Sequence, residues 1–425
     1  MTDTRAWLSS KLVSYVAIAG ATLLLALALG RFELVVLVLP LVTAIAIGLA
    51  LSNPMDVSSE FAVDADRLLE NESLCATVSL RSSAAVEADV AVSVPAGMSE
   101  LGGPARATVL LAEQRRALQF RLCADRWGVR TVGPIALRVW GPGRFVWFDQ
   151  VVHEGRQVNV YPAVDRMRTE IAPARTQVFT GNYVSRVSGD GLEFSDVRQF
   201  VPGDSPRRVN WRVTTRRQIL HVDEFHPERN ADVVLFLDTF ADVGAPRRSS
   251  LDLAVRGAAT LAAHYIARKD RVGLVVFGGL VGWLRAASGR SQMYRIVDQL
   301  IGIRATMSYA AKEIDYLPRR SLPPLALVIA FSPLVDERAL NAFVDLAARG
   351  YVLMVVDTLP EASIAPGPTA EDRLAHRAWR LLRAAKRFEL TRLGVPVLEW
   401  DGQQGLDAVA AAAPDLRRMP RARGA

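Results

Sequence analysis

Cysteine, histidine and aromatic side chains are scarce in this chain of 425 residues, which has two cysteines, five histidines and 7% aromatic residues. Cys75 and Cys123 both fall opposite the apolar residues of their expected strands, so we expect reduced thiols and no disulfide through a core. His221 and His226 lie five residues apart on extended chain and point to opposite faces, which disfavours a shared metal. Nucleophile-elbow, zinc-protease and phosphate-loop motifs are all missing. The sequence therefore predicts a protein that is not an enzyme and has no cofactor.

The charge is positive but mixed in sign, with 51 Lys and Arg against 44 Asp and Glu and a net charge of +7. Interspersed acids suit a solvated surface better than a nucleic-acid groove, and no basic run is interleaved with aromatics. We predict no nucleic-acid partner. The one basic block closes the chain, at Arg417, Arg418, Arg421 and Arg423. A solvated end is the first interpretation of this tail, and contact with anionic lipid is the alternative.

Two uncharged apolar runs open the chain, at residues 12–29 and 34–51, and four residues separate them. Each would form about 27 Å of helix, close to the hydrocarbon thickness of a bilayer. We predict two transmembrane helices within residues 12–52, forming a hairpin in the inner or plasma membrane. Arg5 and Lys11 flank the first run, while Arg31 is balanced by Glu33, so the positive-inside rule favours a cytoplasmic N-terminus over residues 1–11. The soluble domains would then also be cytoplasmic.

The soluble part divides into β structure and then alternating strands and helices. Residues 53–165 show period-two alternation between turn signals, which predicts an antiparallel β-sandwich. Residues 231–402 start with an apolar strand over 233–237 that ends at Asp238, and strands and helices then alternate, which predicts a doubly wound α/β domain. Residues 403–425 are expected to hold a C-terminal helix and the basic tail. The predicted fold class is multidomain: a transmembrane helical hairpin, an antiparallel β-sandwich and a doubly wound α/β domain.

Residues 166–230 hold a dense run of charges, turn formers and aromatics. Pro202-Gly203-Asp204 predicts a tight turn between two strands. The nearby arginines and carboxylates predict a buried bidentate ion-pair network, with a docking or catalytic site as the alternative. The run also contains a characteristic set of residues: Glu193, Phe194, Arg198, Pro202, Gly203, Asp204, Arg208, Trp211, Glu224 and Phe225. With these residues the run resembles the signature of the bacterial "domain of unknown function 58" family, which has no established chemistry.

The element order of the α/β domain, with Asp238 at the end of its first strand, resembles a von Willebrand factor A domain, which many members of that family carry. Such domains usually hold Mg²⁺ through carboxylate and hydroxyl oxygens at the strand ends. Here Asp238, Asp242 and Asp336 are candidate ligands of a degenerate site, because Phe240 stands where a serine is usual. The other interpretation is that Asp238 caps its loop and the scaffold serves protein contacts. Phe240, if exposed, is then a candidate docking residue.

Proteins that resemble this one accompany MoxR-type AAA+ ATPases, so the resemblance implies such a partner beside the lipid bilayer. We therefore expect a membrane-anchored, non-enzymatic adaptor that acts in assembly, maturation or envelope homeostasis. Two alternatives stay open. One is a Mg²⁺-dependent ligand-binding domain at Asp238, and the other is a hydrolase that uses Asp204, Glu193 and the arginines beside them.

Overall fold

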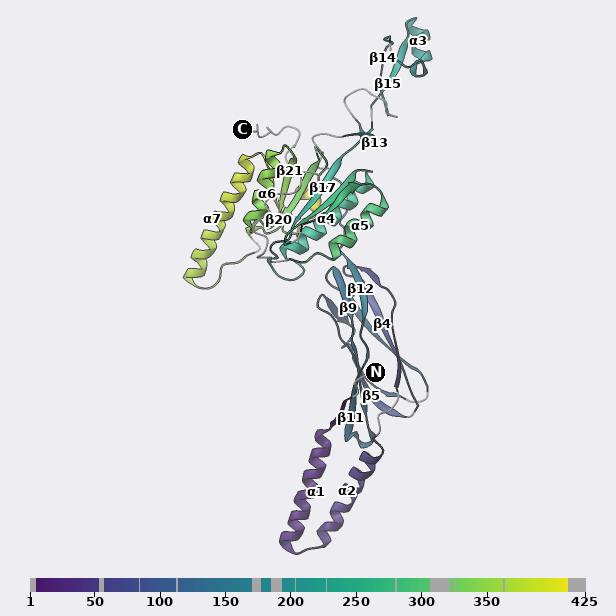
Figure 1. Cartoon of the computed structure of the whole chain (residues 1–425), viewed down its shortest axis with the longest axis vertical. Coiled ribbons are helices and arrows are strands. Elements are labelled where there is room, and N and C mark those ends of the chain that lie inside the picture. The colour runs from purple at the N-terminus through teal and green to yellow at the C-terminus, as the bar shows by residue number, and fades with distance from the viewer. Residues whose placement is uncertain are drawn as a thin grey trace. The chain divides into compact units, whose positions relative to one another are not determined.

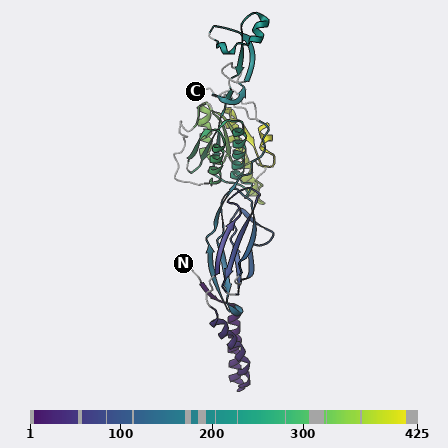
Figure 2. The same cartoon turned by 90° about the vertical axis from the view of Figure 1, so that its right-hand side faces the viewer.

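The computed structural model (Figures 1 and 2) describes residues 5–411, except 53–56, 84, 112–113, 170–176, 185–192, 203, 227, 280, 306–321, 325 and 362–363. The chain forms two compact units, residues 1–161 and 162–425, and each is treated by itself below. The first unit contains an apolar helical pair and β-sheets, and the second contains a mixed sheet covered by helices. The layout is thus multidomain α/β.

The two N-terminal helices are α1 (Ser10–Leu29) and α2 (Glu33–Ala50), with mean hydropathies of 2.3 and 2.4. Ser9 caps the start of α1, and Gly30 ends it with φ +61°, the left-handed conformation that glycine adopts without strain. Only 17% of α1 and 11% of α2 is buried. A core helix of a soluble protein would bury most of its apolar surface, so these helices have the length, hydropathy and exposure of membrane spans.

The segment before α1 is a strand and not only a tail. Strand β1 (Arg5–Leu8) pairs antiparallel with β11 (Val146–His153), which places Trp7 opposite Trp147. From the sequence, residues 1–11 are predicted only as a cytoplasmic N-terminus, because four residues before an apolar helix carry no periodic signal. The Ser9 N–H donates to the Phe145 carbonyl at 2.8 Å, so the chain enters α1 directly from the sheet.

The sandwich of the first unit is built from three sheets around one core. The core contains side chains from the two larger sheets, such as Leu74 and Leu80 from one and Val90 and Leu137 from the other. One pair, β3 with β12, is parallel, so the sandwich is not purely antiparallel as the alternation had predicted. The sheets are β1-β11-β10 (Ile135–Trp140)-β5 (Val86–Val92)-β7 (Arg106–Leu111), β2 (Val57–Val63)-β4 (Ser73–Ser82)-β8 (Arg116–Ala124)-β6 (Met98–Leu101), and β3 (Arg67–Leu69)-β12 (Arg156–Tyr161)-β9 (Gly128–Val132).

The second unit is organised by a six-stranded sheet in the order β19-β18-β17-β20-β21-β22. All neighbours are parallel except β19, which runs antiparallel to β18 at one edge. The elements are β17 (Asp232–Asp238), α4 (Ser250–Ala267), β18 (Arg271–Phe277), β19 (Val281–Ala287), α5 (Arg290–Ile301), β20 (Leu327–Ser332), α6 (Glu337–Ala348), β21 (Val352–Asp357), α7 (Ala370–Arg392), β22 (Val397–Glu399) and α8 (Leu406–Ala411).

Helices cover both faces of this sheet (Figure 1). Val234 and Phe236 of β17 pack with Phe343 of α6 and Leu390 of α7 in one core cluster. On the opposite face, a Cβ at Gly257 of α4 would overlap the ring of Phe331 in β20, so the helix backbone lies directly on that strand. Every residue of β17 is buried, as expected for a central parallel strand.

Residues 177–230 form two strand pairs and a short helix. The pairs are β13 (Gln177–Val184) with β16 (Glu228–Asn230), and β14 (Glu193–Gln199) with β15 (His221–His226). Between β14 and β15 lie a 3₁₀ turn (Pro206–Arg208) and α3 (Trp211–Arg217). The sequence predicts strand, turn and strand here and does not reveal α3, whose seven residues are too few for a helical period to show.

Candidate functional site at the strand carboxyl ends

The end of β17 is closed by a carboxylate. Asp238 is 1% exposed, and its Oδ2 accepts a 2.6 Å hydrogen bond from the hydroxyl of Ser332, the last residue of the neighbouring strand β20. Its Oδ1 accepts the backbone N–H of Phe240 at 3.1 Å. The Ser332 hydroxyl oxygen in turn accepts the N–H of Leu334 at 3.0 Å. Asp238 therefore fastens the first loop of the sheet to the end of β20.

Burial dominates the electrostatics of this carboxyl group. Loss of solvent raises the pKa of Asp238 to about 6, against the lowering effects of the hydrogen bonds from Ser332 and Phe240. The charge of Asp336 raises this pKa further, and the guanidinium of Arg338 lowers it. The site thus disfavours a charge at Asp238 more than its two hydrogen bonds offset.

Asp336 is engaged by an arginine of the next helix. It is the N-cap of α6, where its Oδ1 accepts the backbone N–H of Arg338 at 2.9 Å. The Arg338 guanidinium donates to both carboxylate oxygens, from Nε at 2.9 Å and from Nη2 at 2.8 Å. The side-chain hydrogen bond from Arg338 is the main cause that lowers the pKa of Asp336. This carboxylate is charged, and Arg338 neutralises it.

Phe240 does not stand at an exposed loop tip. Its side chain is 3% exposed and packs edge-to-face against Phe277 of β18, with ring centroids 5.2 Å apart. The Arg338 guanidinium also lies over this ring, 4.0 Å from its centre. The condition on which Phe240 was a candidate docking residue is therefore not met, because the loop after β17 folds back and adds the ring to the core.

The third predicted ligand, Asp242, accepts the backbone N–H of Leu251 at 3.2 Å in the first turn of α4. The structure thus gives each predicted ligand a protein partner: Ser332 for Asp238, Arg338 for Asp336 and the start of α4 for Asp242. Among the described residues, no three His, Cys, Asp or Glu side chains are grouped so that they could hold a metal ion. Mg²⁺ requires an octahedral set of oxygens, and a buried phenyl ring beside a guanidinium does not fit it.

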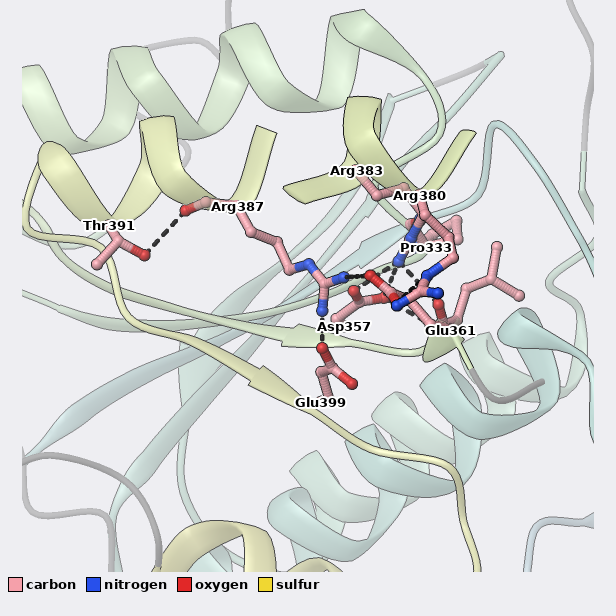
Figure 3. A network of polar contacts seen from close by, with 9 residues as sticks. Pro333, Asp357, Glu361, Arg380, Arg383, Arg387, Thr391 and Glu399 are labelled. Carbon is pink, nitrogen blue, oxygen red and sulfur yellow. Dashed lines mark hydrogen bonds and ion pairs between the residues drawn. The ribbon is translucent and has the colours of Figure 1, made fainter. Parts of the chain in front are cut away.

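A buried ion pair between the end of β21 and α7 was not predicted from the sequence (Figure 3). Asp357 ends β21 and is 0% exposed, and Arg383 of α7 donates to its two oxygens at 2.7 and 2.5 Å. The same guanidinium reaches the carbonyls of Pro333 and Leu359. Burial raises the pKa of Asp357 although Arg383 opposes the rise. The sequence does contain a sign of this pair, because Asp357 ends an apolar strand. It does not show which of the arginines of α7 would pair with that aspartate.

Around this pair, α7 is held to the strand ends by further arginines. Arg380 and Arg387 both pair with Glu361, at 2.7 and 2.5 Å. Arg387 also pairs with Glu399 at the end of β22. Figure 3 shows these side chains pointing from one face of α7 toward the strand ends. This face of α7 is therefore fixed by charge-assisted hydrogen bonds.

In residues 166–230, which we call the signature segment, Arg198 and Asp204 form a bidentate pair with both N–O distances at 2.7 Å. Their side chains are 41% and 21% exposed, so this part of the network is a surface pair and not the buried one expected. Asp204 Oδ2 also accepts a hydrogen bond from the backbone N–H of Val201 at 2.8 Å, which closes the turn at Pro202. An Arg–carboxylate fork placed across a surface turn fixes the turn conformation.

Most other signature residues are placed by the backbone alone, and Trp211 also by its side chain. Phe194 and Phe225 are paired across β14 and β15, and Glu193 pairs with His226, next to Glu224 and Phe225 in β15. Trp211 begins α3 and is 68% exposed. Gly203 and the side chains of Glu193, Phe194, Arg208, Glu224 and Phe225 lie outside the described part of the structure, as does the basic tail at 417–423.

Fold and site together define a class: a multidomain chain with an apolar helical pair, a β-sandwich and an α/β domain whose strand ends are closed by protein contacts. The model of the family described as "Protein of unknown function DUF58" matches residues 196–365. The match starts in the signature segment and extends through β21, so it covers the loop of Asp238 and the ends of β17 and β20. The resemblance to this family is thus supported for that part of the chain.

Curated relatives are uncharacterized proteins of Mycobacterium bovis and Mycobacterium tuberculosis, 27% identical over 188 residues, which is 42% of this chain and 58% of theirs. The chain thus spans just over half the length of the curated relatives it matches. Solved structures include the cupredoxin domain of amoB from Nitrosocaldus yellowstonii, with 12% identity, 26% of this chain and 89% of that chain covered, and a TM-score of 0.18. A CARDB domain from Pyrococcus furiosus gives 16% identity, 26% and 95% coverage and a TM-score of 0.16. Likenesses this slight carry no argument about fold or function.

Proposed function

We propose that this protein is a membrane-anchored, non-enzymatic adaptor that presents a von Willebrand factor A-like domain to protein partners. The observation that carries the proposal is the closed edge of the α/β sheet. The strand order, with one antiparallel edge strand and an aspartate ending β17, supports the von Willebrand factor A comparison. Where such domains usually hold their ion, Ser332 donates a hydrogen bond to Asp238 and Arg338 donates to Asp336. A scaffold whose carboxylates are already engaged by other side chains suits protein contacts better than metal-dependent ligand binding.

The anchor is the pair α1 and α2. Their exposed surfaces are almost entirely apolar, with charges only at Lys11 and Glu33 in the first turns, so they would be unfavourable in water and suit lipid. Because β1 and β11 share a sheet, the segment before α1 and the sandwich after α2 must lie on the same side of the membrane. The positive flank at Lys11, against the balanced loop between the spans, makes that side cytoplasmic in our proposal.

The proposed partner is a MoxR-type AAA+ ATPase, with a role in assembly, maturation or envelope homeostasis. This part rests on the family resemblance. The hydrolase alternative is weakened at Asp204, whose oxygens are taken by Arg198 and the Val201 N–H on a half-exposed turn. A catalytic carboxyl group would need a free oxygen directed at a substrate.

The test is affinity capture of the full-length, detergent-solubilised protein from its native cells, with and without ATP. Wild type is compared with Asp238→Asn, which keeps the shape of the side chain but is a poor Mg²⁺ ligand. The adaptor proposal expects an AAA+ ATPase in equal amounts with both proteins. Loss of partners with Asp238→Asn alone would support the metal-dependent alternative, and the absence of any ATPase would refute the partnership.

A further inference from the structure

Helix α7 carries an apolar stripe on the face turned away from its own domain. We call Leu374, Ala378, Leu381, Ala385 and Phe388 the α7 seam. The three large side chains are 67%, 73% and 70% exposed, and both alanines are exposed as well. Large apolar side chains gathered on one exposed face usually mark an interaction surface.

The opposite face of α7 explains why the seam points outward. Arg383, which is half a turn of the helical wheel away from the seam, is buried in its pair with Asp357. At the N-terminus, Thr369 and Asp372 form a capping box. The helix is thus folded and oriented before any partner arrives, which removes most of the ordering cost of binding.

The spacing of the seam is that of a coiled coil. Its members follow one another at intervals of four, three, four and three residues, which is the a and d pattern of about two heptads. Leucine and phenylalanine stand at the d positions, and alanine stands at the a positions. Small residues at alternate positions let a second helix approach closely, whereas a lipid surface favours large apolar side chains throughout.

The alternation of sizes favours an antiparallel second copy. In a parallel pair each seam residue would meet its own counterpart, so well-filled layers of large side chains would alternate with layers in which two alanines face each other and leave space unfilled. In an antiparallel pair the a positions face the d positions. Leu381 then meets Ala385 of the second copy, and Phe388 meets Ala378 of the second copy. Every such layer contains one large and one small side chain, which fills the contact evenly.

The charges at the two ends of the seam select the same orientation. Glu371 and Arg392 continue the heptad pattern to the next a position at either end. Both are exposed, and neither forms an ion pair with any residue in the described part of the chain. A parallel copy would bring like charges together at both ends. In the antiparallel register, Arg392 lies beside Leu374 of the second copy, one helical turn from Glu371 of that copy and within reach of its carboxylate.

A lipid surface fits this helix less well than a second copy does. The exposed charges beside the seam are mixed in sign, with Glu371 and Glu389 as well as Arg377 and Arg392, so the acids offset the attraction of anionic headgroups for the arginines. Leu382, which is 64% exposed, borders the seam at an e position. In an antiparallel pair e positions face each other, so Leu382 would meet its own counterpart and lose that exposure.

We propose that the α7 seam binds a second copy of this chain through two antiparallel α7 helices related by a two-fold axis. Such a contact is self-complementary and closes at two copies. It is short, so it would be weak between free molecules. Copies confined to one membrane meet at a high effective concentration, and this step rests on the proposed anchor. The partner ATPase plays no part in the inference.

The test uses full-length protein without its two native cysteines, in native membranes, treated with a short bifunctional maleimide. Leu381→Cys and Ala385→Cys lie near the proposed two-fold axis, and we expect covalent dimers from both. Leu374→Cys should not link to itself, because the antiparallel register separates the two copies of this residue by about 27 Å along the helix axis. Leu110→Cys, 71% exposed on β7 of the other unit, is the second control and should not link. Self-linking at Leu374→Cys would indicate parallel helices and refute the proposed orientation.

Charge variants in the Ala385→Cys background give a second readout. Arg392→Glu should lower the dimer yield about tenfold, because two attractive pairs become repulsive. The double change Arg392→Glu with Glu371→Arg should restore it, since the pairs are then reversed. Hydrogen exchange of the α7 amides in each variant checks that the helix itself is still folded.

The proposal is refuted by equal linking at seam and control positions, by no linking at Leu381→Cys and Ala385→Cys, or by a folded double variant that fails to recover. Linking of the seam only to a different protein would also refute it. None of these outcomes depends on whether an ATPase is captured, so failure here leaves the adaptor proposal to its own test.

Discussion

Replacing Asp238 with asparagine should remove a pH dependence from the stability of the α/β domain. Burial raises the pKa of Asp238 from 3.8 to about 6. At pH values between these two pKa values the folded state holds a proton that the unfolded chain releases, and this proton stabilises the folded state. The stabilisation has its full size below the unfolded pKa of 3.8 and is lost as the pH rises through the folded pKa of about 6. Its full size is about 3 kcal/mol, and about 1.4 kcal/mol of it disappears between about pH 5 and about pH 7.

The assay is hydrogen exchange of the β17 and β20 amides in full-length protein at increasing urea, which isolates this domain from the rest of the chain. The free energy of unfolding of wild type minus that of Asp238→Asn should fall by about 1.4 kcal/mol from about pH 5 to about pH 7. Ser332→Ala removes a hydrogen bond to the carboxylate, so it should move the fall to higher pH. If the difference in the free energy of unfolding between wild type and Asp238→Asn stays constant with pH, Asp238 has the same pKa in the folded and the unfolded state, and the reasoning is refuted. If millimolar Mg²⁺ restores the stability that wild type loses at high pH, a cation reaches the Asp238 carboxylate, which contradicts the conclusion that these residues do not fit Mg²⁺.

Three further outcomes follow from the same contacts. Arg383→Met should destabilise the α/β domain by about 3–5 kcal/mol because Asp357 is left buried without its partner, and adding Asp357→Leu should recover much of that loss in the same exchange assay. Phe240→Ala should lower the stability of this domain by about 3–5 kcal/mol, and partner capture should fall only in proportion to the folded fraction, since the ring is in the core; loss of capture without loss of stability would contradict this. In a chain without its native cysteines, Leu8→Cys should react with impermeant maleimide only after cells are opened, because β1 pairs with the sandwich on the side proposed to be cytoplasmic; labelling of intact cells would refute that side.

Much of the local structure was predictable, because apolar periodicity is a property of neighbouring residues. The apolar runs predicted α1 and α2, and the run before Asp238 predicted β17. Two short elements were missed, β1 and α3, with four and seven residues. A segment of that length contains too little of either period to be recognised, and β1 exists only because β11 offers it an edge.

The candidate site shows more clearly what could not be predicted from the sequence. Sequence alone singled out Asp238, Asp336 and Phe240 as residues that would matter at the strand ends. It could not tell that Ser332 would donate to Asp238, that Arg338 would take Asp336, or that the Phe240 ring would turn into the core. These partners come from different strands and helices, and their meeting depends on how β20 and α6 pack beside β17.

The sequence by itself determined which residues are apolar, where strands and helices alternate, and which carboxylates follow the strands. These are local facts, and the hydrophobic effect and backbone geometry act on them directly. The tertiary structure alone decided which charges became neutralised, which aromatic ring was buried, and which face of α7 was left exposed. Those outcomes depend on contacts between segments far apart in the chain, such as the one between Asp238 and Ser332, which lie 94 residues apart. The free energy of a charge or ring depends on the partners that the fold brings to it.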